Sequence, residues 1–179
     1  MIEATIESTY PAWHEQARAL LAADVPPVEV VWTERAENQP LLSGLTASDS
    51  AAVRSKASAP PISVPRKFGE AAKLAARHRS AGRWGLLYRV LWRITHAERS
   101  LLDDEVDPDA HELRSLVRAV KEDVERMKAF VRFRSIGPQG AEHFVAWHRP
   151  DHDVAELVPA HFASRYPNMQ WSIFTPFAS

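Results

Sequence analysis

The sequence predicts an α+β fold in which several helices pack on a small, mostly antiparallel sheet, with a β-α-β element at the N-terminus. Long segments repeat apolar residues at intervals of three or four, as helices do, and two segments on either side of residue 137 alternate apolar and polar residues, as strands do. The first 34 residues combine both patterns. The chain of 179 residues, 45% of them hydrophobic, is sufficient for one domain spanning residues 1–179.

The β-α-β element is expected over residues 1–34. Residues 2–6 alternate polar and apolar side chains, which predicts a short strand. Pro11 stands at the start of a segment with apolar residues at helical spacing, and Pro26 follows its end. The β-branched residues 28–32 predict the second strand.

The middle of the chain divides into a loop and three helices. Residues 35–62 are rich in Ser, Ala, Pro, Gly and Asn, which predicts a flexible loop ahead of a helical and hairpin core over residues 63–176. Helices are expected over residues 64–79 and 83–97 because both segments have an apolar face. Asp107 and Pro108 form an N-cap arrangement for a third helix that runs to about Phe130.

A β-hairpin is predicted next. Residues 130–134 and 142–148 alternate, and the turn sequence GPQG at residues 137–140 separates them. The alternation places Arg132 and Arg134 on one face of the first strand, about 7 Å apart, which matches successive phosphates of an extended nucleic-acid strand. The alternative is an exposed sheet face that is balanced by the acidic helix.

One helix and one strand complete the predicted fold. Asp151 or Asp153 caps the helix, in which Pro159 predicts a kink or a break. Residues 170–176 have the composition of a third strand beside the hairpin.

The net charge of −1 conceals an uneven distribution of charge along the chain. Residues 65–99 hold nine basic and two acidic residues, and residues 126–149 hold five and one, whereas residues 100–125 hold three and nine. Basic residues between aromatic ones suit phosphate contacts and base stacking. In the alternative interpretation the aromatic side chains form the core and the arginines pair with the acidic segment. The candidate nucleic-acid-binding residues are Arg83, Arg89, Trp92, Arg93, Arg132, Arg134 and Trp147.

Few residues suggest metal or catalytic chemistry. The chain has no cysteine, which excludes disulfides, thiolate zinc sites and iron–sulfur clusters within it, and it has no glycine-rich phosphate loop or GxSxG motif. His148, Asp151 and His152 are the densest set of candidate ligands for zinc or manganese, and His152 is the one candidate acid or base. The alternative is a strand-to-helix turn with an aspartate cap. We expect no cofactor.

The sequence contains neither a membrane span nor the pattern of a signal peptide at its start. We therefore expect a cytoplasmic protein without a membrane partner.

Several segments resemble, in order and spacing, a family of DNA metabolism proteins of unknown function. The resemblance covers nearly the whole chain apart from residues 35–62, and the segments that carry it are WHEQARALLAADVPPVEVVW, VPRKFGEAAKLAARHR, RWGLLYRVLWRI, DPDAHELRSLVRAVKEDVERMKAFVRFR, HFVAWHRPDHDV and HFASRYPNMQWSIFTP. In that family the domain is commonly fused ahead of a uracil-DNA glycosylase superfamily domain and accompanied by a radical SAM protein. The resemblance implies DNA repair or modification.

The cysteines and uracil-binding motifs of the downstream glycosylase domain are not among these residues, so we expect no uracil excision by them. The family pattern is carried by core and functional residues together: Arg83, Tyr88, Trp92, Arg93, Asp123, Met127, Phe130, Arg132, Arg134, Trp147, His152, Trp171 and Ser172.

The function expected from these observations is a nucleic-acid-binding accessory domain in DNA repair, without catalysis of its own. Its expected partners are single-stranded or damaged DNA, the uracil-DNA glycosylase domain and the radical SAM protein. Two alternatives belong to other classes. One is a metal- or His-dependent enzyme that acts on a nucleotide or nucleic acid through His152, and the other is a module that docks the glycosylase or the radical SAM protein.

Overall fold

The computed structural model describes residues 1–35, 64–138 and 142–176. The loop predicted over residues 35–62 lies outside the described residues from residue 36 onward. The elements follow in the order β1 (Ile2–Ile6), α1 (Tyr10–Ala22), η1 (Pro27–Glu29), β2 (Val30–Glu34), α2 (Arg66–Ala75), α3 (Arg83–His96), η2 (Leu101–Asp103), α4 (Pro108–Phe130), β3 (Arg134–Ile136), β4 (His143–Trp147), η3 (Ala155–Leu157), α5 (Pro159–Arg165) and β5 (Trp171–Phe174). The predicted α+β class is confirmed.

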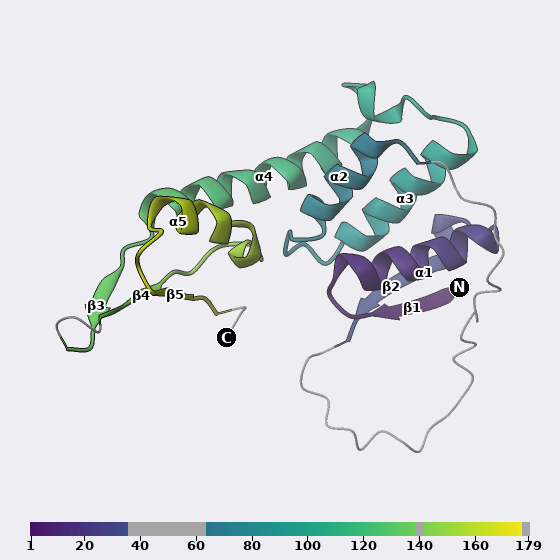
Figure 1. Ribbon diagram of the computed structural model, residues 1–179. Coiled ribbons are helices and arrows are strands. Elements are labelled where there is room, and N and C mark those ends of the chain that lie inside the picture. The colour runs from purple at the N-terminus through teal and green to yellow at the C-terminus, as the bar shows by residue number, and fades with distance from the viewer. Residues whose placement is uncertain (36–63, 139–141, 177–179) are drawn as a thin grey trace, which may run out of the picture.

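Helix α4 connects two groups of elements (Figure 1). The first group, β1, α1, β2, α2 and α3, packs near its N-terminal part, and the second group, β3, β4, β5 and α5, surrounds its C-terminal end. Each group has its own buried apolar cluster, to which α4 contributes Leu113 and Leu116 in the first and Val120 and Met127 in the second. We call the two groups, each with its share of α4, the N-terminal and the C-terminal lobe.

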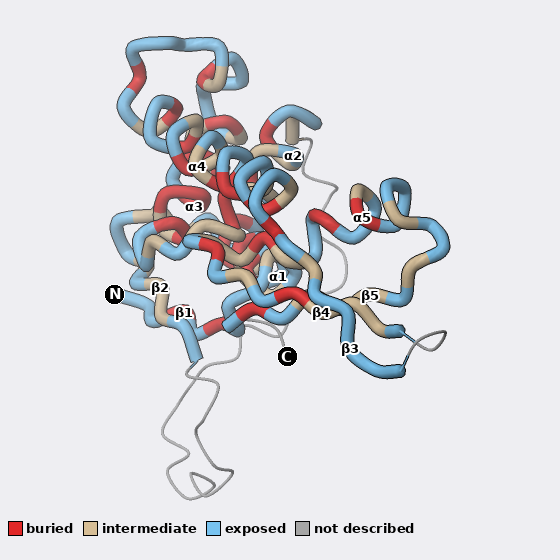
Figure 2. Tube along the Cα trace, turned by 90° about the vertical axis from the view of Figure 1, so that its left-hand side faces the viewer, coloured by how far each residue is buried: buried red, intermediate tan, exposed pale blue. Residues whose placement is uncertain are grey.

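The N-terminal lobe contains the predicted β-α-β element. Strands β1 and β2 pair in parallel, from Ile2 opposite Val30 to Ile6 opposite Glu34, and α1 connects them. Helices α1 and α3 bury Trp13 and Trp84 completely, and the two rings stack with their centroids 6.3 Å apart. Figure 2 shows that buried positions gather along α3 and the side of α4 that faces it.

The C-terminal sheet differs from the predicted hairpin in two respects. Strand β3 begins only at Arg134, because α4 continues through Phe130 and Val131 and Phe133 then pack against the lobe instead of pairing. Val131 is buried, and the Phe133 ring lies edge-on to Phe162 with centroids 5.6 Å apart. The strand predicted over residues 130–134 is therefore wrong at its start.

The third strand lies beside the hairpin, as predicted, but its direction differs. Strands β3 and β4 are antiparallel, whereas β5 pairs with β4 in parallel. A parallel return requires a crossover, and η3 with α5 supplies it. Pro159 occupies the first turn of α5, so the predicted break in this segment is confirmed. Among the described helices, none has the combination of length and apolar character that a bilayer crossing demands.

The two phenylalanines of α5 and β5 allow the C-terminal core to be tested. Phe162 is 2% exposed and Phe174 is 50% exposed. We expect Phe162→Ala to lower the free energy of unfolding by about 3–5 kcal/mol because it removes a fully packed ring. Urea denaturation measures the effect, and Phe174→Ala is the control, with an expected change within about 0.5 kcal/mol. Equal effects of the two substitutions would contradict the assigned core.

Candidate nucleic-acid interface

Arg83, the first residue of α3, is an internal residue. Its side chain is 5% exposed, and its Nη2 donates to Ser8 Oγ at 2.6 Å and lies 2.5 Å from Glu34 Oε1. Its other nitrogens donate to the carbonyl oxygens of Ala76 and Ser80 at 3.1 and 2.8 Å. Because all three nitrogens serve contacts between elements of the N-terminal lobe, we leave Arg83 out of the interface.

Arg89 and Arg93 of α3 pair with the acidic start of α4. Arg93 lies 2.6 Å from both Glu98 and Asp107 and 3.0 Å from Asp109, and Arg89 lies 3.1 Å from Asp109. Hydrogen bonds from Arg93 hold the pKa of the Asp107 carboxyl below its ordinary value. On α3, the structure thus agrees with the interpretation in which arginines balance the acidic segment.

Trp92 lies on the same helix and has two aromatic neighbours. Its ring stacks on His96 with centroids 3.8 Å apart and meets Tyr88 edge-on at 6.3 Å. Trp92 is half-buried and packs against the N-terminal core. We therefore do not place it in an interface.

The three-stranded sheet of the C-terminal lobe has one face toward the core and one face away from it. Ala146 is buried in the core, and Trp171 and Ile173 of the neighbouring strand pack against it. Because side chains alternate along a strand, the residues between these point to the other face. In Figure 1, α5 and the end of α4 lie on one side of the strands. The outward face consists of Arg134, Ile136, His143, Val145, Trp147, Ser172 and Phe174.

Two large aromatic side chains lie next to each other on this outward face. Trp147 ends β4 and Phe174 ends β5, and the parallel register places them directly opposite each other. Trp147 is 65% exposed and Phe174 is 50% exposed. The neighbouring pair of His143 Nε2 and Ser172 Oγ forms a hydrogen bond of 2.9 Å, which confirms that both strands direct these residues to the same side.

The outward face carries positive but no negative charge. None of the three strands contains Asp or Glu, and Arg134 is exposed. Among the residues that the structure describes, Arg134 forms no ion pair. The face can therefore accept an anionic group next to two aromatic rings.

Arg132 precedes β3 and does not share its alternation. Its Nη1 donates to the carbonyl oxygens of Ala129 and Val131 at 2.7 and 3.0 Å, which binds the side chain to the end of α4. The residue is exposed. The expected spacing of about 7 Å between Arg132 and Arg134 assumed one continuous strand, so it does not apply.

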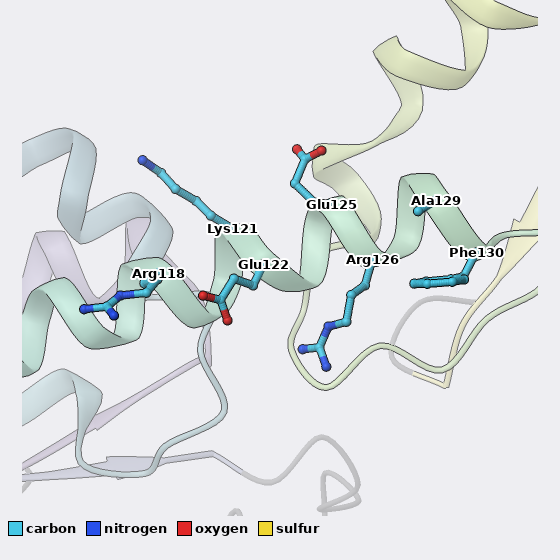
Figure 3. A pocket seen from close by; sticks show the side chains of 7 residues that line it. All are labelled: Arg118, Lys121, Glu122, Glu125, Arg126, Ala129 and Phe130. Atoms are coloured by element: carbon cyan, nitrogen blue, oxygen red, sulfur yellow. The ribbon is translucent and has the colours of Figure 1, made fainter.

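A shallow hollow of about 600 Å³ lies along α4 and ends near the sheet (Figure 3). Arg118, Glu122, Arg126 and Phe130 project from one side of the helix in this view, and Lys121 and Glu125 from the opposite side. The lining combines three basic and two acidic side chains, so the hollow does not strongly favour a ligand of either charge.

His152 lies at the contact between the two lobes. Its backbone N–H donates to Asp123 Oδ2 at 2.8 Å, and its ring centroid is 4.1 Å from that of His78. Its Nδ1 is buried and has no hydrogen-bond partner, and burial lowers the pKa of the imidazole. Arg77 adds an ion pair to this contact, with its Nη1 3.0 Å from Asp153 Oδ2.

The structure does not bring His148, Asp151 and His152 together as a metal-binding group. The described parts of the chain contain no set of three His, Cys, Asp or Glu residues placed to hold an ion. Asp151 pairs with Arg126 at 3.0 Å instead, and the backbone N–H of His148 donates to the Phe174 carbonyl at 3.0 Å. The segment is a turn that connects β4 to the C-terminal crossover, as the alternative interpretation held. The predicted cap by Asp151 or Asp153 is wrong, because Val154 and Val158 precede η3 and α5 and neither element has a side-chain cap.

Of the outward face, sequence reasoning named only Arg134 and Trp147 as candidate binding residues, and at the lobe contact it assigned no role to Asp123 or His78. Phe174 and Ser172 could have been assigned from the alternation of the last strand, with Trp171 and Ile173 pointing inward. Asp123 lies three residues after the buried Val120, which indicated a carboxylate on the core side of α4. For His78 the sequence carried no such signal. The outward face thus combines residues that the sequence predicted, Arg134 and Trp147, with residues that it did not assign to a binding site.

A comparison with protein-family models finds a match over residues 81–177, which the family description calls Domain of unknown function (DUF4130). The matched range runs from the residues before α3 to the end of β5, so it contains α4 and the whole C-terminal sheet. Neither the curated proteins nor the solved structures include a match to this chain.

The Arg93–Asp107 pair predicts a specific pH dependence of stability. A carboxyl whose pKa is lower in the folded state stabilises the fold above its unfolded pKa of about 3.9, and this stabilisation is lost as the pH falls through the folded pKa. Asp107→Asn retains an N-cap residue but removes the charge. We expect the substitution to lower the free energy of unfolding by about 1–3 kcal/mol at pH 7 and to flatten its decrease below about pH 4.

Urea denaturation at a series of pH values measures this effect. Glu105→Gln removes an exposed carboxylate from the same acidic segment and is the matched control. If the free energy of unfolding of Asp107→Asn had the same pH profile as that of the wild type, the Arg93–Asp107 pair would not be the source of this pH dependence.

Proposed function

The chain belongs to the family Domain of unknown function (DUF4130), and we propose that its C-terminal sheet binds single-stranded DNA on the outward face. The observation that carries this proposal is the exposed pair Trp147 and Phe174 on a face without acidic residues. Exposed aromatic rings on an open sheet are the common platform for unpaired bases.

Each part of the face has a role in this proposal. Trp147 and Phe174 stack on bases, and each stacked ring contributes about 1–3 kcal/mol to the free energy of binding. Arg134, exposed and without an ion pair among the described residues, contacts a backbone phosphate. Arg132, which is exposed, adds a second positive charge before the start of β3, where its side chain is hydrogen-bonded to the end of α4. The charge of the face therefore complements the backbone while its rings hold the bases.

Stacking on a side chain favours single-stranded over duplex DNA. In a duplex, neighbouring bases cover both faces of each base, whereas an unpaired or displaced base leaves a face free. None of the described helices carries an exposed row of unpaired arginines, because those of α3 pair with α4. The face therefore suits a single strand or a damaged site with an unstacked base.

The biological setting of the proposal comes from the family resemblance. A domain that precedes a uracil-DNA glycosylase and accompanies a radical SAM protein belongs to DNA repair or modification. We propose an accessory role in which this chain holds a single strand while the partner enzyme performs the chemistry. That role does not require His152 as an acid or base, and its backbone N–H and ring serve the lobe contact instead.

Three substitutions on the outward face test the proposal. We expect Trp147→Ala and Phe174→Ala each to weaken binding of a fluorescent single-stranded oligonucleotide by about 5- to 150-fold, since each removes one stacking ring. Arg134→Glu should weaken it as well and reduce the slope of log affinity against log salt by about 0.7, the value for one phosphate contact. Fluorescence anisotropy at several salt concentrations measures both quantities.

Arg99→Glu is the matched control because it reverses an exposed charge of the N-terminal lobe. Duplex DNA of the same sequence should bind more weakly than the single strand. Wild-type protein that binds no DNA at low salt would overturn the proposal. In that case the exposed rings would instead indicate a protein-docking face, which pull-down of the glycosylase or radical SAM partner with wild type and Trp147→Ala would establish.

A further inference from the structure

A second concave site lies in the N-terminal lobe, between α1 and the start of α2. It has a volume of about 410 Å³, within the range of small-molecule sites. Its lining combines aromatic, aliphatic and basic residues and includes no Asp or Glu. We propose that this cleft binds a nucleoside monophosphate, as a free nucleotide or as the phosphorylated 5′ end of a DNA strand.

The base-binding part of the cleft is supplied by aromatic and apolar side chains. Tyr10 and His14, one helical turn apart on α1, stack with their ring centroids 5.5 Å apart. Trp13 and Phe68, both buried, form the floor between the two helices. A flat ring inserted here would lie against aromatic surface, which is how nucleobases are commonly held.

The phosphate-binding part is supplied by cations. Arg18 follows His14 by one further turn of α1, is exposed, and forms no ion pair among the described residues. Arg66 begins α2 and pairs only with Glu70, at 2.7 Å, where both side chains are largely exposed. Burial is the largest cause of the lowered pKa of His14, and the nearby charges of Arg18 and Lys73 lower it further, so these cations contribute a positive potential at the cleft. An anionic group on the ligand would be stabilised by this potential.

Gly69 is the feature of the cleft that packing does not explain. It lies in the second turn of α2, where glycine is less favourable than alanine by up to about 1 kcal/mol. A Cβ atom built there would meet no atom within 4 Å, so no neighbouring atom would clash with a side chain at this position. The glycine instead leaves the wall of the cleft open, as close approach of a ligand requires.

Calorimetric titration of the intact protein tests the inference. We expect deoxyadenosine 5′-monophosphate to bind at least tenfold more tightly than either deoxyadenosine or inorganic phosphate, because the cleft recognises ring and phosphate together. Arg18→Glu should weaken the nucleotide at least tenfold, and Gly69→Leu should abolish binding by filling the cleft. Gly69→Ala is the matched control for the glycine, with binding retained. Circular dichroism verifies that each variant is folded.

The two sources of the ligand are distinguished in the Trp147→Ala/Arg134→Glu background, in which the outward face of the sheet is disabled. Binding of an oligonucleotide with a 5′ phosphate but not with a 5′ hydroxyl identifies a strand end, and binding of the free nucleotide alone identifies a mononucleotide. Absence of nucleotide binding to the wild type, or binding unchanged by both Arg18→Glu and Gly69→Leu, would overturn the inference. Because the variants of the sheet and of the cleft are separate, either proposal can fail without the other.

Discussion

The structure depends on one constraint, which is that α4 supplies a wall to two separate apolar cores. The helix has 23 residues and so spans about 35 Å. Its apolar stripe passes from Leu113 and Leu116 in the N-terminal lobe to Val120 and Met127 in the C-terminal lobe without a break. Because one stripe serves both cores, the lobes are held together by the helix itself. Leu74 of α2, which packs against the C-terminal cluster, and the polar contact around Arg77 and His152 add to this connection. The side of α4 turned away from the cores carries mixed charge.

This arrangement explains why the charge of the sequence is separated into blocks. The N-terminal turn of α4 is acidic, as the helix dipole favours, and α3 lies against it with Arg89 and Arg93 on the facing side. Ion pairs between the basic side chains of α3 and the acidic side chains of α4 provide partners for charged groups that the packing of the two helices partly buries. Arg93 contacts Asp107, which is also the N-cap of α4, so the same carboxylate starts the helix and anchors it to α3. The basic side chains Arg89 and Arg93 of α3 are therefore used inside the fold.

Local patterns predicted most of the elements, and contacts between distant segments decided where prediction failed. The cap at Asp107, the break at Pro159 and the N-terminal β-α-β element follow from residue types at fixed positions, and all are present. The strand over residues 130–134 was wrong because alternation over five residues cannot distinguish a strand from a connector whose apolar side chains pack on α5. Likewise, the burial of Arg83 depends on Glu34 and Ser8, which are about 50 and 75 residues away in the chain. No short segment of the sequence contains Arg83 together with either of these partners.

The direction of β5 determines the character of the outward face. With an antiparallel return, the end of β5 would lie next to the start of β4, and Phe174 would be near His143 and far from Trp147. The crossover through α5 reverses the strand, and the parallel register places the two exposed rings side by side at one end of the sheet. Exposing both rings to water forgoes the free energy that their burial would contribute. The core does not require them, because Trp171, Ile173 and Phe162 already fill the opposite face. In the proposed function, a single DNA strand covers these two adjacent rings, which the fold itself leaves in solvent, and the absence of acidic residues from the strands suits its anionic backbone.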